Sequence, residues 1–311
     1  MALSTPALRL HPDRLLPADP AERPVARRLY EATRDLPVIS PHGHVDPRIL
    51  LDNEPFPDPA TLLVTPDHYV TRLLHAGGVS LDELGVGKPA MSEEASRRAW
   101  RLLCEHWNLY RGTPVRFWLE AELADIFGVK VRPSAESADA IYDQVAGCLA
   151  RDEHRPRALF ERFGIEVLAT TDDPCSDLST HAALREDPTW RGRVVPTFRP
   201  DRYLEPSEPG WPEAARRLGQ AAGADTGHYE GYVSALEQRR RHFIAHGAVS
   251  ADHSHADVRT EALEPAEAAR IYRAALAADA TEGESVAFRR HMLAEMARMS
   301  CDDGLVMTLH P

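Results

Sequence analysis

The pattern of apolar and polar positions predicts strands and helices that alternate along most of the chain. Short apolar runs end in polar residues at five places, in the segments 38–47, 165–174, 193–201, 247–257 and 304–311. The segments between the later runs carry apolar residues at helical spacing. Strands that alternate with helices usually pair in parallel, so the pattern predicts an α/β fold.

The region from 58 to 163 differs, because its apolar and aromatic residues recur at helical spacing without a strand-like run. It includes "EEASRRAWRLLCEHWNLY" and "PVRFWLEAELADIFG". We interpret this region as a mainly helical insertion after the first strand. The whole chain, residues 1–311, is then interpreted as one domain.

Composition limits the classes of partner. With 311 residues and 43% apolar content the chain can build a substantial core. Its 36 basic and 48 acidic residues give a formal net charge of -12, which argues against nucleic acid or an anionic membrane as a partner. No apolar run approaches the ~18 residues of a membrane span, and the start of the sequence does not resemble a leader. We therefore expect a cytoplasmic protein, with four dispersed cysteines that form neither disulfides nor a zinc site.

Two histidines, His42 and His44, end the first apolar run in "VISPHGHVDP". In an extended chain residues i and i+2 point to the same side, so both imidazoles can face one ion. Such a pair also arises by chance, but His310 at the end of the last run favours a metal site. Nitrogen and oxygen ligands without thiolate suit Zn, Mn, Fe or Ni, and the spacing does not choose among them.

Other polar residues follow later strands. "TTDDP" contains Asp172, which a turn or helix cap would also explain, and "TFRPD" contains Arg199, a residue type that clamps carboxylates. "ADHSHAD" contains Asp252 and His253. The carboxyl ends of parallel strands meet at one edge of a sheet, so we expect these side chains to share a pocket with the histidines.

The segment "TPDHYV" places His68 and Tyr69 after the first strand. A helix start capped by Asp67 would account for them without any function. A phenol beside an imidazole is also well suited to move protons on a sugar.

Taken in order along the chain, these motifs resemble the uronate isomerases (glucuronate isomerases) of the amidohydrolase superfamily. The similarity runs through "HGH", "DHY", "RFWLEAELADIFG", "TTDDP", "TFRPD", "HFIAHGAVSADHSHAD" and "MTLHP". The resemblance implies a distorted (β/α)8 barrel of the TIM type with a helical insertion after strand 1. It also implies interconversion of D-glucuronate and D-fructuronate, or of D-galacturonate and D-tagaturonate, by metal-assisted proton transfer through a cis-enediol.

The resemblance further implies a role for each matched residue. His42 and His44 would bind one divalent metal, usually Zn. His68 and Tyr69 match the catalytic HY pair of the family, in which the tyrosine helps to reprotonate the intermediate. Substrate binding, of a small sugar acid, is implied for the matched residues Arg199, Asp172, Asp252, His253 and His310.

The sequence departs from the family in one respect. Family members continue beyond the position of Pro311, and that part should supply the last three strands and an Asp that binds the metal and takes part in proton abstraction. We therefore expect about five of eight strands. An incomplete barrel exposes strand edges that favour a partner chain, so a homo-oligomer is left open.

Two alternative functions are kept. A metal-dependent hydrolase of the same superfamily would share the HxH pair, although DHY and RPD together favour the isomerase. An inactive fragment or non-catalytic binding subunit is the other alternative, and isomerisation of a uronate would exclude it.

Overall fold

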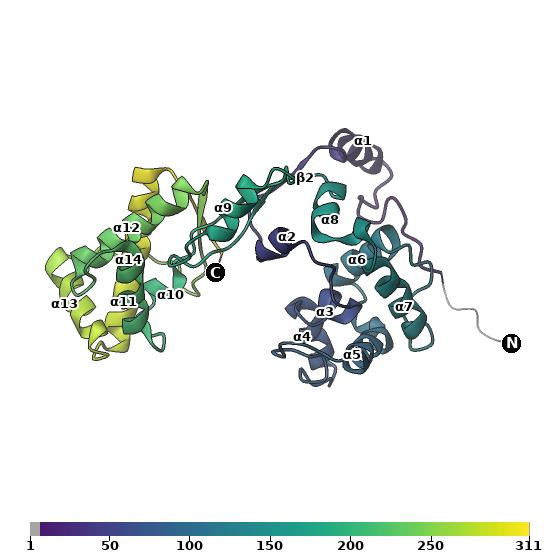
Figure 1. The fold of residues 1–311 in the computed structure, drawn as a ribbon, viewed down its shortest axis with the longest axis horizontal. Helices are drawn as coiled ribbons and strands as arrows, with labels where there is room; N and C mark the ends of the chain where they lie inside the picture. Colours follow the sequence, from purple (N-terminus) through teal and green to yellow (C-terminus); the bar gives the residue numbers. More distant parts are fainter. Residues whose placement is uncertain (1–6, 311) are drawn as a thin grey trace. The chain divides into compact units, whose positions relative to one another are not determined.

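The computed structural model describes residues 7–310 and divides into two compact units (Figure 1). Within that range the first unit comprises residues 7–36 and 53–164, and the second comprises residues 37–52 and 165–310. The start of the sequence and the end of the predicted segment 304–311 lie outside the described residues. None of the helices within residues 7–310 has the length and apolar character needed to cross a membrane.

The first unit is helical, and the region 58–163 falls within it. Its helices are α1 (Arg23–Thr33), α3 (Pro59–Leu63), α4 (His68–Ala76), α5 (Glu93–Glu105), the 3-10 helix η1 (Trp107–Tyr110), α6 (Pro114–Ala121), the π-helix η2 (Glu122–Ile126), α7 (Ala138–Leu149), the 3-10 helix η3 (Asp152–His154) and α8 (Pro156–Arg162).

Helix α5 shows how local sequence builds this unit. The Ser92 side chain caps the helix by accepting the Ala95 N–H at 3.2 Å, which satisfies one of the unpaired donors of the first turn. The inward face of the helix buries apolar side chains, and the Trp100 indole donates to the Ala138 carbonyl of α7 at 3.0 Å. This hydrogen bond joins two helices across the core of the unit.

A partly buried acid, Glu122, lies where α6 passes into the π-helix η2. Burial raises the pKa of the Glu122 carboxyl to about 7, and the nearby Asp67 charge contributes further. Short π-helical turns often mark functional or strained positions.

The second unit contains five parallel strands, which confirms the predicted α/β fold. They are β1 (Val38–Ser40), β2 (Ile165–Ala169), β3 (Arg193–Val195), β4 (Ser250–His253) and β5 (Val306–Leu309). β1 pairs with β2, β2 with β3, and β4 with β5, all in parallel. Phe198, just beyond β3, bridges Asp172 on one side and Ala251 on the other, so the strands follow one another in chain order.

The helices of the second unit connect these strands. They are α2 (Arg48–Asp52), α9 (Ser179–Glu186), α10 (Asp201–Leu204), α11 (Trp211–Ala222), α12 (Tyr229–Ala245), α13 (Pro265–Leu276) and α14 (Glu282–Asp303). α11 packs against α12 and α13, and α14 packs against α13 and β5. A capping box of Thr281 and Glu284 starts α14, and Gly304 ends it in the left-handed conformation that turns the chain into β5.

A buried arginine ties these helices together. The Arg240 guanidinium on α12 is fully buried and donates from Nε and Nη2 to the Asp303 carboxylate, at 2.6 and 2.9 Å. It also lies 5.5 Å from the centre of the Phe198 ring. The pair fixes the end of α14, from which β5 begins.

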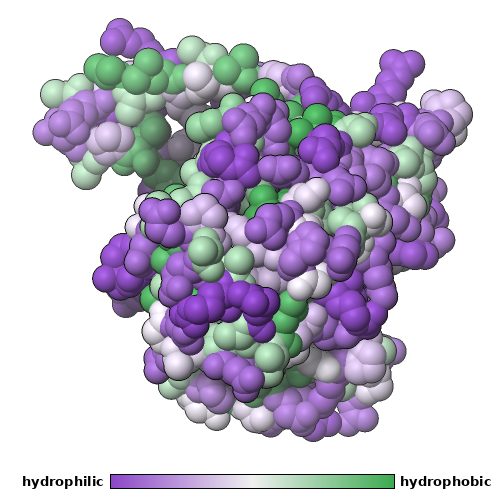
Figure 2. Space-filling view, turned by 90° about the vertical axis from the view of Figure 1, so that its left-hand side faces the viewer, coloured by the Kyte–Doolittle hydropathy of each residue, from purple (hydrophilic) through white to green (hydrophobic). Residues whose placement is uncertain are grey.

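The strands differ in exposure. Every residue of β4 is buried, whereas Ile39 of β1 is 64% exposed and Val306 of β5 is 63% exposed. Parallel strands are normally covered on both faces, so β1 and β5 are the less protected members of the sheet. Seen from the side where Figure 1 places α13, the surface is mostly hydrophilic with small apolar patches between (Figure 2).

The raised pKa of Glu122 predicts a pH-dependent stability. Between about pH 4.5 and 7 the folded chain retains a proton that the unfolded chain releases, so stability falls as pH rises through this window. Glu122→Gln should abolish that part of the pH dependence and raise the free energy of unfolding at pH 8 by up to about 3 kcal/mol. Urea unfolding at pH 4.5, 6 and 8 measures this.

Glu105→Gln, a change at an exposed acid at the end of α5, is the control and should leave the profile unchanged. If the free energy of unfolding depends on pH in the same way in the Glu122→Gln variant and in the wild-type chain, the raised pKa of Glu122 is contradicted.

Candidate metal centre

The HxH pair has the geometry of two ligands to one ion. After β1 ends at Ser40, the Nε2 atoms of His42 and His44 lie 3.2 Å apart. Two imidazoles bound tetrahedrally to one Zn would place their ligand atoms about 3.4 Å apart. The glycine between them lets the segment lie close to β2, since a Cβ at Gly43 would come within 3.1 Å of the Ala169 carbonyl oxygen. The Thr171 hydroxyl donates to the Gly43 carbonyl at 2.8 Å and fixes this approach.

Asp252 on β4 is the centre of the group. Its side chain is 0% exposed, and its Oδ1 accepts the Thr308 hydroxyl at 2.8 Å and lies 3.0 Å from His310 Nδ1. Its Oδ2 is buried without a hydrogen bond within the described residues, 3.4 Å from Arg199 Nη1 and 3.8 Å from His42 Nδ1. A buried carboxylate oxygen without a hydrogen bond is costly unless a cation compensates it.

The ligand-type atoms of His42, Asp252 and His310 all lie within 4.8 Å of one another, among the residues that the structure describes. Imidazole and carboxylate donors without sulfur suit Zn and the other divalent metals predicted from the sequence. Nε2 of His42 faces His44, while its Nδ1 is directed toward Asp252. A carboxylate beside the second ring nitrogen of a ligand histidine is a common way to orient that ligand.

The surroundings of His44 favour the neutral form of its imidazole. Burial lowers the pKa of the His44 imidazole, and the positive charges of His42 and Arg199 lower it further, against the opposing effect of Asp252. Metal ions bind the neutral imidazole, so this environment favours binding near neutral pH.

Arg199 lies at the same strand ends, after β3. Its Nε donates to Asp201 Oδ2 at 2.8 Å, while its Nη1 is the atom that approaches Asp252. A guanidinium has five donors, so hydrogen-bonding capacity remains for an anionic ligand.

His253, although adjacent to Asp252, does not join this group. Its side chain is fully buried, with Nδ1 at 3.2 Å from the Thr308 carbonyl oxygen. Burial lowers the pKa of His253 to about 4, so the ring is neutral. Successive residues of a strand point to opposite faces, which explains why the two neighbours separate.

Asp172 belongs to a second buried polar group. The Thr170 hydroxyl donates to Asp172 Oδ2 at 2.6 Å, and His181 Nε2 lies 2.9 Å from the same hydroxyl oxygen. Burial lowers the pKa of His181. Because the Thr170 hydroxyl gives its single proton to Asp172, Nε2 of His181 is the donor in its contact with Thr170. The Asp172 carbonyl accepts the Arg199 N–H at 3.1 Å, so Asp172 supports the strand end that carries the arginine.

His68 and Tyr69 lie in the first unit, at the start of α4. Asp67 caps this helix by accepting the Tyr69 N–H at 2.7 Å, as the purely structural interpretation predicts. The Tyr69 side chain is nonetheless 43% exposed, with the Arg72 guanidinium 4.6 Å and the Trp118 ring 6.0 Å from its ring centre. Its phenol therefore remains accessible to solvent.

The sequence analysis did not single out Thr308, Asp201 or His181 as functional. Thr308 and Asp201 lie inside the quoted motifs "MTLHP" and "TFRPD", each two positions from a predicted site residue, and that spacing was a usable signal. His181 has no such signal, because its partner Thr170 is 11 residues away and separated from it by a loop.

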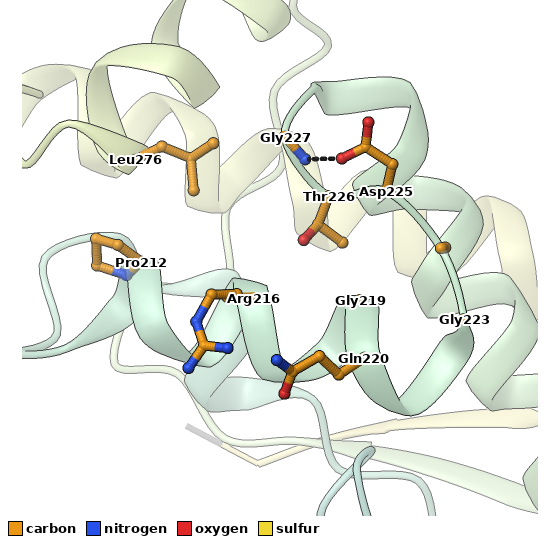
Figure 3. Close-up of a pocket in the computed structure, with 10 residues that line it drawn as sticks. Pro212, Arg216, Gly219, Gln220, Gly223, Asp225, Thr226, Gly227 and Leu276 are labelled. Carbon is orange, nitrogen blue, oxygen red and sulfur yellow. Dashed lines mark hydrogen bonds between the residues drawn. The ribbon is translucent and has the colours of Figure 1, made fainter.

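A hollow of about 680 Å³ also lies in the second unit, between α11 and the loop before α12 (Figure 3). Its polar side chains are engaged locally: Arg216 pairs with Glu213, and Asp225 accepts the Gly227 N–H at 2.8 Å. None of the residues that the sequence predicts to be functional line it.

Comparison with known proteins identifies the family. The family model described as "Glucuronate isomerase" matches residues 20–311. The chain belongs to the glucuronate isomerase family. The resemblance predicted from the order of the motifs is thereby confirmed.

Members of the glucuronate isomerase family from several bacteria are similar along almost the whole chain. A uronate isomerase of Cutibacterium acnes is 51% identical over 309 residues, which cover 99% of this chain and 66% of the relative. One of Corynebacterium efficiens is 51% identical over 302 residues, covering 97% of this chain and 64% of the relative. The chain thus spans slightly less than two thirds of the length of these relatives.

Two solved structures of the family agree with the fold. The crystal structure of glucuronate isomerase from Caulobacter crescentus matches with a TM-score of 0.94 and 43% identity, over 98% of this chain and 64% of that one. A uronate isomerase from Thermotoga maritima matches with a TM-score of 0.85 and 28% identity, over 92% of this chain and 62% of that one.

The close approach at Gly43 predicts a cost for any side chain there. In Gly43→Ala the new Cβ would press on the backbone carbonyl of Ala169, which cannot move aside as a flexible side chain can. We expect the free energy of unfolding to fall by about 1–3 kcal/mol, measured by urea denaturation. Gly283→Ala on α14, where a Cβ meets nothing within 4 Å, is the control and should be neutral or stabilising. Equal stability of the Gly43→Ala variant and the wild-type chain would contradict the close approach.

Proposed function

We propose that the chain isomerises a uronate, as the names of its relatives indicate for those proteins, and that the reaction converts an aldose into a ketose. The observation that carries the proposal is the buried Asp252 carboxylate, whose Oδ2 faces His42 on one side and Arg199 on the other. The same strand ends thus hold groups that bind a cation and groups that bind an anion. A site for a divalent metal and a sugar acid needs both kinds of group, because the metal is a cation and the sugar acid is an anion.

The architecture proposed for this site is a (β/α)8 barrel. Its support is that five parallel strands follow one another in chain order, with helices between them. The apolar exposed side chains of β1 and β5, Ile39 and Val306 among them, are consistent with further strands beside them. Active sites of such barrels form at the carboxyl ends of the strands, where the candidate residues lie.

The residues present fit a divalent metal, with Zn as the first candidate. His42 and His44 would hold it through their Nε2 atoms, with Asp252 beside them as a third ligand or as the group that orients His42. The buried Oδ2 of Asp252, which accepts no hydrogen bond from the described residues, supports this assignment. When bound, the metal would stabilise negative charge on a substrate oxygen.

Arg199 would bind the substrate through the donors that Asp201 and Asp252 leave free. Its guanidinium matches a carboxylate or a pair of hydroxyl oxygens in two-point hydrogen bonding. Asp172 and His253, which lie in separate buried groups, would act only by supporting the strands.

Isomerisation moves hydrogen between two carbons and two oxygens. The C2 proton leaves to a base, the O2 hydroxyl proton moves to O1, and C1 gains a proton, so the aldehyde becomes an alcohol and C2 becomes the ketone. His310, held by Asp252 through Nδ1, has its second ring nitrogen available to take the C2 proton. Tyr69 is proposed as the donor that delivers a proton to C1. His310 then releases the C2 proton to solvent, and Tyr69 regains a proton from solvent, so both residues return to their starting state. Which of the two uronate pairs is used, and a location in the cytoplasm, stay predictions.

The proposal predicts metal-dependent turnover by the chain. With added Zn or Mn we expect the chain to convert D-glucuronate to D-fructuronate. Chromatography of the products measures this conversion. His42→Ala should abolish both metal binding and turnover. Tyr69→Phe should keep the metal and lower turnover about a hundredfold, because it removes only a proton donor.

The matched control is His11→Ala, at an exposed histidine of the first unit whose ring accepts only a local backbone hydrogen bond. It should behave like the wild-type chain. A folded, metal-binding chain without turnover would contradict isomerase activity of these 311 residues. Turnover that survives His42→Ala would contradict the metal site.

A further inference from the structure

Two carboxylates compete for one guanidinium at the strand ends. Asp201 Oδ2 accepts from Arg199 Nε at 2.8 Å, whereas Asp252 Oδ2 lies 3.4 Å from Arg199 Nη1 without a hydrogen bond. The better contact is thus with Asp201, the residue two positions after the arginine. The contact of Arg199 with the buried Asp252 carboxylate is the weaker of the two.

Asp201 is also contacted by residues that follow β4. Both of its carboxylate oxygens lie 3.2 Å from the Ser254 N–H, which belongs to the loop that leaves β4. His255, 5% exposed, has its Nε2 at 3.4 Å from Asp201 Oδ1, and its Nδ1 at 3.6 Å from Glu205 Oε2. These contacts fix the Asp201 carboxylate relative to β4, the strand that carries Asp252.

We propose that Asp201 is a positioning residue that keeps Arg199 from closing onto Asp252. This role rests on the proposed function, in which the Asp252 group receives a divalent metal. A guanidinium released from Asp201 would turn toward the buried Asp252 carboxylate and donate a charge-assisted hydrogen bond to its Oδ2. That ion pair would neutralise Asp252 and occupy the Oδ2 that the structure leaves without a hydrogen bond.

The consequence is measurable as metal affinity, without any turnover. In Asp201→Ala, Zn binding should weaken about tenfold, as is typical when a residue behind a metal ligand is lost. In Asp201→Asn the amide oxygen can still accept from Ser254 and Arg199 but carries no charge, so a smaller loss is expected. Zn affinity is measured by competition with a chromophoric chelator on the full chain.

The double variant Arg199→Gln with Asp201→Ala separates positioning from a merely structural role. If Asp201 acts by restraining Arg199, removal of the arginine abolishes the competition and restores wild-type Zn affinity in the double variant. If Asp201 acts only by holding the Ser254 loop, the loss persists without the arginine. That second result would overturn the proposal.

Glu205→Gln is the matched control. Glu205 lines the same hollow as Asp201 and contacts His255 and Arg289, but not Arg199. Zn affinity should be unchanged in this variant, and thermal unfolding of each variant verifies that it is folded. A loss in Glu205→Gln equal to that in Asp201→Ala would contradict a specific role for Asp201.

The outcomes also distinguish this proposal from the proposed function. A wild-type chain that binds Zn and shows the double-variant rescue, but does not isomerise D-glucuronate, supports the positioning role and contradicts the activity. A chain that isomerises D-glucuronate with no effect of Asp201→Ala on Zn affinity supports the activity and contradicts the positioning role. A wild-type chain without measurable Zn affinity contradicts the metal site and the role of Asp201 together.

Discussion

The candidate site depends on one buried carboxylate, that of Asp252. Its Oδ1 is satisfied by Thr308 and His310 from the end of β5, while its Oδ2 faces His42 and Arg199 from the ends of two other strands. A fully buried charge is stable only where such groups surround it. The requirement to compensate this charge therefore gathers side chains that lie more than 250 residues apart in the sequence.

The sequence predicts that these residues lie near one another, because parallel strands align their carboxyl ends. The HxH pair, Arg199, Asp252 and His310 each follow an apolar run, and the structure places them at or near the carboxyl ends of β1, β3, β4 and β5. The sequence could not separate Asp252 from His253, since both follow the same run. Which of two neighbours faces the site depends on strand register and on Thr308, which are set by tertiary packing.

Other features depend on burial that no local pattern reveals. In the sequence Glu122 is one more acid on a helix, yet packing within the first unit partly buries it and raises its pKa to about 7. The hydrogen bond between Arg199 and Asp201 joins residues only two positions apart in one motif. Its proposed role depends on Asp252, a competing carboxylate on another strand, which the motif does not reveal. The family itself was predictable, because the order of seven motifs is specific where each motif alone is not.

We propose that the HxH pair and Asp252 form a metal centre. Anomalous diffraction at the Zn edge from crystals of the Zn-loaded chain would locate the ion. We expect one strong peak at about 2.0–2.2 Å from Nε2 of both His42 and His44, with Asp252 as the nearest carboxylate. A peak elsewhere on the chain, or none at these three residues, would contradict it.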